Sequence, residues 1–262
     1  LADRVGGLWS QVQTIGFESI STPMAWLGLA GYCFQLYFDF WGYSRMAVGL
    51  GHMLGFSLPR NFDHPYAART MTDFWRRWHI TLGAWFRDYV YIPMGGSRQG
   101  MPRTILNLLV VWLLTGIWHG STWNFLLWGL LIFLLIALEK LGLGPFLERH
   151  RRVARVYMLL AIPLTWLLFA VPDVGQIGIY LTRLFPFFGG GIAVNRGDFL
   201  RYGKQFGLFL VLGFLLSSPW PERIWVRIRS SAVGTAVCLL LFWVAVYYMS
   251  VSVNDPFMYF SF

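Results

Sequence analysis

The chain has 262 residues, of which 56% are hydrophobic and only 13% are charged. Soluble domains carry about 25% charged residues, and a soluble fold could not hide this much apolar surface. The composition therefore predicts a membrane protein. The formal net charge is +9, but the basic residues gather between apolar runs. This distribution is typical of the cytoplasmic loops that set membrane topology, and it argues against nucleic-acid binding.

Neither end of the chain nor its cysteines indicate a secreted, disulfide-bonded protein. No basic stretch precedes an apolar core at the start, so we expect no signal peptide. Because the chain begins at Leu1 without a methionine, we expect residues 1–262 to be a single domain from the C-terminal part of a longer protein. Cys33 and Cys238 lie inside apolar runs without CxxC spacing and are expected to be buried apolar side chains.

Apolar runs in chain order predict an all-α, polytopic integral membrane protein with about six transmembrane spans. The second and third runs are short and are separated only by His119–Thr122. They are either two short helices or one broken element. Irregular backbone at membrane depth requires surrounding protein or a water-filled cavity, so a cavity is expected near His119. The six runs are Met24–Trp41, Ile105–Trp118, Trp123–Leu138, Tyr157–Val171, Phe206–Ser218 and Ala232–Val251.

Two basic loops orient these spans. Glu139–Arg155 and Pro219–Ser230 each carry an excess of lysine and arginine over acidic residues. The positive-inside rule places both loops in the cytoplasm, because two predicted spans separate them. The intervening stretch, Pro172–Gln205, would then face the opposite side of the membrane.

The segment Asp73–Tyr89 has the pattern of one amphipathic helix that lies at the membrane interface or dips into it. Aromatic residues and Leu82 fall on one side, and His79 falls at the boundary of that face. Asp73 and Arg77 have i,i+4 spacing and can pair. The arginines of this segment are expected to face solvent or lipid headgroups. A less favoured alternative is that Arg76, Arg77 or Arg87 binds a donor that carries phosphate.

Two histidines surrounded by tryptophans are the candidate catalytic residues. His119 follows Trp118 and lies between Gly116 and Gly120. A neutral imidazole in a dry tunnel can take a proton from a hydroxyl during acyl transfer. The alternative is a structural histidine between helices, and the residues alone leave both open. His79 is either a catalytic partner or a histidine at the edge of an apolar face.

Other chemistries are not favoured by the sequence. No pair of histidines has i,i+4 spacing, and there is no HExxH, P-loop or GxGxxG motif, so we expect no metal site and no tightly bound cofactor. Asp39 lies late in the first apolar run, where a carboxylate needs a partner. A structural salt bridge or a helix cap is favoured over catalysis for Asp39.

Several ordered motifs resemble the membrane-bound O-acyltransferase family, in particular the branch that contains bacterial alginate O-acetyltransferase membrane subunits. The resemblance covers nearly the whole chain. Its motifs are Gln35–Ser44, Asn61–Tyr66, Asp73–His79 with the run Trp-Arg-Arg-Trp-His, Trp85–Tyr89, Tyr91–Gly96, the Trp-His-Gly motif Gly116–Gly120 and the ending Pro256–Phe260. Arg45 stands where the alginate enzymes typically have an acidic residue, so alginate is not assumed to be the acceptor.

This resemblance implies an enzyme of the bacterial cytoplasmic (inner) membrane with a central tunnel lined by histidines. His119 would be catalytic and His79 the second essential histidine. Trp78 and Arg77 would shape the donor side, with Trp118, Asp39 and Asn107 in support. The donor would be acetyl-CoA or another cytoplasmic acyl thioester. The acetyl group would pass, often through an extracytoplasmic acetyltransferase-type partner protein, to a polysaccharide.

Two other functions remain open at this point. The first has the same fold but transfers D-alanine in place of an acetyl group, because enzymes that transfer D-alanine to teichoic acid also resemble this family. Their donor is a carrier-protein thioester. The second is a non-enzymatic transporter or assembly scaffold, which would need no acid–base histidine.

Overall fold

The computed structural model describes residues 1–188, 195 and 197–251, and within them every regular element is helical. The motif Pro256–Phe260 lies outside the described residues. Short turns of 3-10 helix occur at Pro65–Ala67 and Pro186–Phe188, and π-helical turns occur at Arg87–Tyr91 and Glu139–Leu143. The α-helices are α1 Ala2–Ile15, α2 Thr22–Met53, α3 Met71–Arg77, α4 Ile80–Phe86, α5 Gly100–His119, α6 Trp123–Leu138, α7 Gly144–Arg149, α8 Arg151–Ala170, α9 Val174–Leu184, α10 Asp198–Leu216, α11 Trp220–Ile228 and α12 Ala232–Val251.

Five helical segments in the described part of the chain are long and apolar enough to cross a membrane. Four of them are α5, α8, α10 and α12. The fifth is the segment Trp123–Arg149, which starts with α6 and continues beyond it. This confirms the all-α, multi-pass membrane architecture. The first predicted span lies within α2, which is not one of the five, because Gln35 and Asp39 lower its hydropathy. Protein rather than lipid covers much of α2, and its N-terminal half is largely buried.

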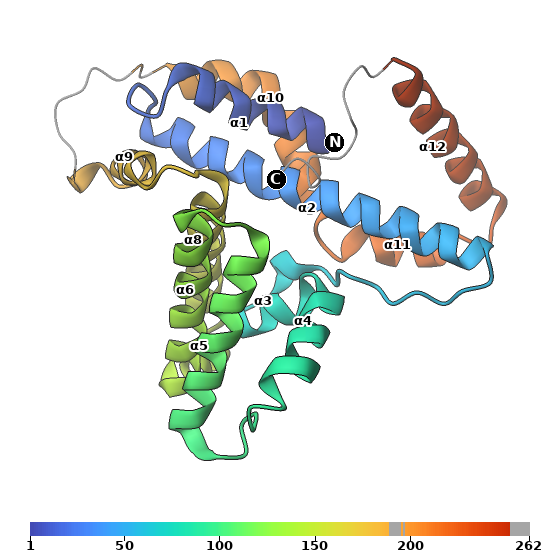
Figure 1. Cartoon of the computed structure of the whole chain (residues 1–262). Coiled ribbons are helices and arrows are strands. Elements are labelled where there is room, and N and C mark those ends of the chain that lie inside the picture. Colours follow the sequence, from blue (N-terminus) through green and yellow to red (C-terminus); the bar gives the residue numbers. More distant parts are fainter. Residues whose placement is uncertain (189–194, 196, 252–262) are drawn as a thin grey trace.

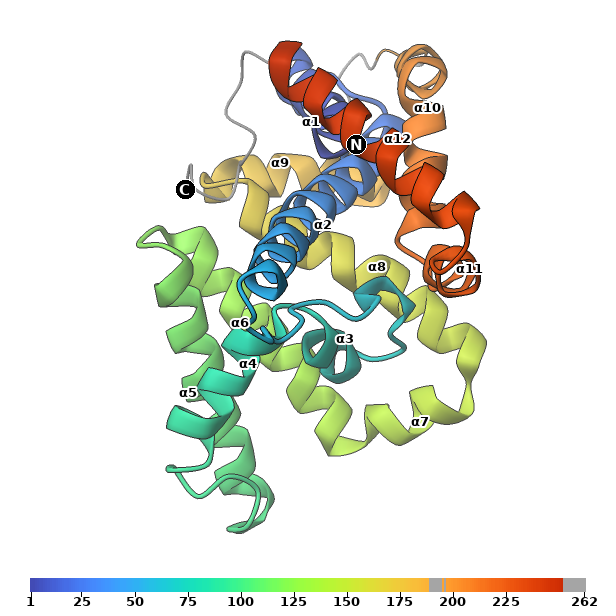
Figure 2. The same ribbon diagram turned by 90° about the vertical axis from the view of Figure 1, so that its right-hand side faces the viewer.

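The helices form two groups, and the segment from α3 to α4, which contains His79, lies between them. Figure 1 shows α5, α6 and α8 side by side, while α1, α2 and α10 form a second group across one end. The turned view in Figure 2 shows α3 and α4 below α2, with α5 on one side and α7 and α8 on the other. Buried aromatic and aliphatic side chains from α1, α2, α3, α6, α8 and α9 make one continuous core.

The second and third apolar runs form two separate helices that pack closely as a hairpin. Two glycines permit this contact. A Cβ atom at Gly116 would lie 2.6 Å from the carbonyl oxygen of Phe125, and one at Gly129 would collide with the carbonyl oxygen of Trp112. Small residues that let backbones approach closely are characteristic of helix pairs in membranes. His119 is the last residue of α5, so this packing sets its position.

The prediction of one amphipathic helix over Asp73–Tyr89 is wrong. Helix α3 ends at Arg77 and α4 begins at Ile80, with His79 in the left-handed conformation (φ 47°, ψ 53°). The predicted Asp73–Arg77 pair is present at 2.8 Å. The helix breaks because an earlier segment supplies competing hydrogen bonds. The amide of Ile80 donates to the carbonyl of Asn61 (3.0 Å), and Phe62 pairs with Trp78 as an antiparallel bridge.

The close approach of α5 and α6 predicts that Gly129→Ala destabilises the protein by about 1–3 kcal/mol, the usual cost of overpacking. The measurement is the unfolding midpoint of the full-length protein in detergent. Gly178→Ala is the matched control, because Gly178 lies within α9 and a Cβ there meets no atom within 4 Å. Equal midpoints for the two variants would show that the glycine contact does not hold the hairpin.

Candidate active site

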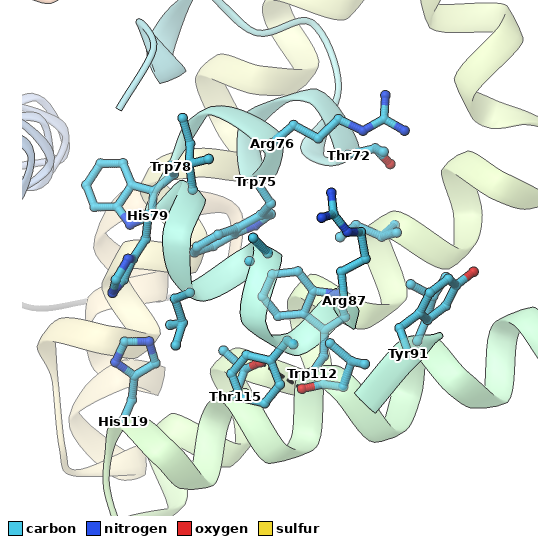
Figure 3. A pocket seen from close by; sticks show the side chains of 18 of the residues that line it. Thr72, Trp75, Arg76, Trp78, His79, Arg87, Tyr91, Trp112, Thr115 and His119 are labelled. Atoms are coloured by element: carbon cyan, nitrogen blue, oxygen red, sulfur yellow. Dashed lines mark hydrogen bonds between the residues drawn. The ribbon is translucent and has the colours of Figure 1, made fainter. Parts of the chain in front are cut away.

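A cavity of about 470 Å³ lies where α3, α4, α5, α6 and α8 meet. His79 and His119 both line it, and Figure 3 shows their side chains on the same side of the cavity. The cavity expected near His119 is therefore present. Much of its wall is aromatic, from the side chains of Trp75, Trp78, Trp112, Trp128, Trp166 and Phe169.

His119 is held among aromatic rings at the end of α5. Its ring stands edge-on to Trp128, with centroids 4.9 Å apart, and to Phe169, with centroids 5.3 Å apart. Trp128 is fully buried on α6, and Phe169 is nearly so on α8. Side chains of α6 and α8 thus pack against the His119 imidazole, which belongs to α5. This arrangement restricts the ring while leaving it at the cavity wall.

His79 reaches the same cavity by a different route, because it occupies the break between α3 and α4. Its ring lies edge-on to Phe40 of α2, with centroids 4.7 Å apart. Burial lowers the pKa of His79 from 6.5 to about 4, because the charged imidazolium loses its water. The ring is therefore neutral at pH 7 and has one nitrogen able to accept a proton or a hydrogen bond.

The predicted supporting residues divide into those at the cavity and those behind it. Trp78 lines the cavity and stacks on Phe74, with centroids 5.6 Å apart. Arg77 lies outside the lining. Its guanidinium binds Asp73 (2.8 Å) and the carbonyl of Asp63 (3.4 Å). Its guanidinium is therefore engaged by Asp73 and by the segment before α3.

The other three supporting residues also lie outside the cavity lining. Asn107 is fully buried, and its amide donates to the carbonyls of Met94 (3.2 Å) and Gly96 (2.9 Å), which fixes the turn before α5. Trp118 is 54% exposed, and its ring centroid lies 6.2 Å from that of His79. Asp39 is buried within α2. Their positions fit support of the fold around the cavity.

Three basic residues also line the cavity, Arg76, Arg87 and Lys140, together with Thr72 and Tyr91. The Arg87 guanidinium is paired with the carboxylate of its neighbour Asp88 (2.7 Å). Figure 3 shows Arg76, Arg87 and Tyr91 away from the two histidines. The sequence favoured a solvent-facing role for the arginines and gave no signal for Lys140. Lys140 reaches the site because the helix beginning with α6 continues beyond Leu138 through a π-helical turn. In the described part of the chain, no three His, Cys, Asp or Glu residues lie together as a metal site would require.

The pH dependence of stability tests the environment of His79. The unfolded chain takes up a proton near pH 6.5, whereas the folded protein does so only near pH 4. Stability is therefore lost as the pH falls through this window, by up to about 1.4 kcal/mol per pH unit from this residue. Unfolding in detergent should show a shallower loss for His79→Gln than for wild type between these values. Parallel curves would contradict a buried, neutral His79.

Comparison with known proteins agrees with this geometry. The model of the MBOAT, membrane-bound O-acyltransferase family matches residues 11–170, which include both histidines and the cavity. The chain is 34% identical over 265 residues to the probable alginate O-acetylase AlgI of Pseudomonas putida. That match covers 94% of the chain and 55% of the relative, so the chain spans about half the length of this relative.

Two further relatives match shorter stretches. A peptidoglycan O-acetyltransferase of Helicobacter pylori is 49% identical over 119 residues, covering 44% of the chain and 23% of the relative. A teichoic acid D-alanyltransferase of Bacillus subtilis is 34% identical over 111 residues, covering 40% and 28% respectively. The family match extends over more than half of the chain and includes both histidines and the residues that line the cavity, so this protein belongs to the membrane-bound O-acyltransferase family.

Proposed function

We propose that the chain forms the acyl-transfer part of a multi-pass enzyme of the bacterial inner membrane. The enzyme moves an acetyl group from a cytoplasmic acyl thioester to a hydroxyl of an extracytoplasmic polysaccharide. One observation carries the proposal. Two histidines from separate elements lie on one side of a cavity that Arg76, Arg87 and Lys140 also line, and Figure 3 shows Arg76 and Arg87 away from the histidines.

The chemistry assigned to the histidine side is general-base catalysis. His119 takes the proton of the acceptor hydroxyl as its oxygen attacks the thioester carbonyl. The new C–O bond forms, the C–S bond breaks, and the departing thiolate takes up the proton that His119 removed from the hydroxyl. His79 acts beside His119 on the reacting groups. The aromatic wall limits hydrolysis of the thioester because it keeps water from the reacting carbon.

The cationic side fits a donor that carries phosphate, such as acetyl-CoA. Guanidinium and ammonium groups bind phosphate oxygens through charge-assisted hydrogen bonds. Lys140 begins the basic loop that the positive-inside rule places in the cytoplasm. A donor entering there would meet Arg76, Arg87 and Lys140 first and would extend its acyl end toward the histidines. This orientation supports a cytoplasmic donor.

A polysaccharide acceptor is supported by the names of the relatives, which act on alginate and peptidoglycan. We assign delivery to the polysaccharide to an extracytoplasmic acetyltransferase-type partner protein. The match to a teichoic acid D-alanyltransferase supports a second function, in which D-alanine replaces the acetyl group. A carrier-protein thioester would then be the donor.

The first functional test is His119→Ala in the full-length protein, expressed in cells with membrane levels matched to wild type. Loss of a general base costs about 10²–10⁴ in rate, so the O-acetyl content of surface polysaccharide should fall to the level of the gene deletion. His150→Ala is the control, because His150 is exposed and packs against Phe146 away from the cavity. Normal acetylation in the His119→Ala cells would remove this residue from the mechanism.

The donor side is tested with Arg76→Gln in inside-out membrane vesicles that contain the full-length protein and labelled acetyl-CoA. A charged hydrogen bond contributes about 1.5–3 kcal/mol, so KM for acetyl-CoA should rise about tenfold or more while kcat changes little. Arg149→Gln, an exposed arginine outside the cavity lining, should behave as wild type. Transfer from a D-alanyl carrier protein but not from acetyl-CoA would favour the second function.

A further inference from the structure

Asn61, on the irregular segment between α2 and α3, holds the three residues that begin at His79. Its carbonyl accepts the Ile80 amide (3.0 Å). Its side-chain Oδ1 accepts both the amide (3.1 Å) and the hydroxyl (2.6 Å) of Thr81. The same Oδ1 faces Nδ1 of His79 at 3.4 Å. One residue therefore contacts the His79 side chain at the helix break and the backbone and side chain at the start of α4.

The hydrogen bond from Thr81 fixes the orientation of the Asn61 amide. A backbone N–H can only donate, so the atom of Asn61 that faces it must be the oxygen and not the NH₂ group. That oxygen can only accept. The His79 nitrogen that faces it, Nδ1, must therefore carry the proton. A neutral imidazole protonated at Nδ1 has its lone pair at Nε2.

Asn61 also holds the backbone conformation that brings His79 to the cavity. The φ of 47° at His79 is uncommon for a residue with a side chain and persists only where its surroundings impose it. The Asn61 carbonyl and the neighbouring Phe62–Trp78 bridge supply that constraint. In Figure 3 the His79 side chain extends toward His119 along the cavity wall.

We propose that Asn61 is the positioning residue of His79: it keeps Nδ1 protonated, so that Nε2 serves the cavity as a hydrogen-bond or proton acceptor. The catalytic consequence rests on the proposed acyl-transfer function, whereas the tautomer does not. A purely structural Asn61 would hold Thr81 without any effect on the imidazole. Thr81→Val separates these two roles, because it removes the 2.6 Å hydrogen bond to the same oxygen and leaves His79 intact.

The test is ¹⁵N NMR of the full-length protein in detergent with labelled histidine, with the His79 signals assigned from their loss in His79→Gln. Wild type and Thr81→Val should show a neutral ring protonated at Nδ1. Asn61→Ala should shift the ring toward the Nε2–H tautomer or a mixture. A wild-type ring protonated at Nε2, or a tautomer unchanged in Asn61→Ala, would overturn the proposal.

Asn61→Asp covers the case in which Asn61→Ala does not fold, because the carboxylate keeps every acceptor contact. The added charge should raise the pH at which His79 titrates by about 1–3 units in the same spectra. An unchanged titration would also overturn the proposal. The other ionisable groups on the elements around His79 are the same in wild type and variant, so they do not contribute to the difference. They include Asp39 and Arg45 of α2, Asp63, Asp73, Arg76 and Arg77 before His79, Arg87 and Asp88 after it and His119 of α5.

Acetyl transfer measured on the same variants separates this proposal from the proposed function. If both hold, Asn61→Ala loses about 10- to 100-fold in kcat, as is typical when the partner that orients an imidazole is removed. A changed tautomer with unchanged transfer would contradict a catalytic role for His79 and would still support the positioning by Asn61. An unchanged tautomer would contradict the positioning whatever the activity.

Discussion

The break between α3 and α4 is the feature on which the candidate site depends. An interrupted helix loses backbone hydrogen bonds, and unpaired backbone groups in an apolar environment are costly. Here Asn61 and Phe62 replace those bonds from an earlier part of the chain. Were α3 and α4 one continuous helix, His79 would follow the helical path of its neighbours. The interruption places its imidazole at the cavity wall.

A buried carboxylate secures the other end of the same segment. Glu139 accepts hydrogen bonds from the amides of Met71 and Thr72, the hydroxyl of Thr72 and the hydroxyl of Tyr157. The first two satisfy N–H groups that a helix start leaves without partners. Because Glu139 directly follows α6, this contact links α3 to the helix that also carries Trp128. Glu139 thus fixes α3, which contributes residues to the cavity wall, to the α5–α6 hairpin, which contributes others.

The cavity combines two environments that acyl transfer requires in one place. Around His79 and His119 the walls are aromatic, and burial keeps His79 neutral. Arg76, Arg87 and Lys140 line the same cavity. The proposed donor, which has an uncharged reactive end and an anionic end, would satisfy both.

Composition and apolar run length were enough to predict an all-helical membrane protein, because both depend on local residue patterns. The resemblance of its motifs indicated the family, and the two histidines that those motifs single out line the cavity. The break at His79 was not predictable from periodicity, since Asp73–Tyr89 has the pattern of a continuous amphipathic helix and the hydrogen bonds that interrupt it come from Asn61. Arg76 and not Arg77 lines the cavity, because Arg77 binds Asp73 and the carbonyl of Asp63, and the contribution of Lys140 follows from the continuation of α6. These features depend on contacts between residues distant in sequence, so only the tertiary structure decided them.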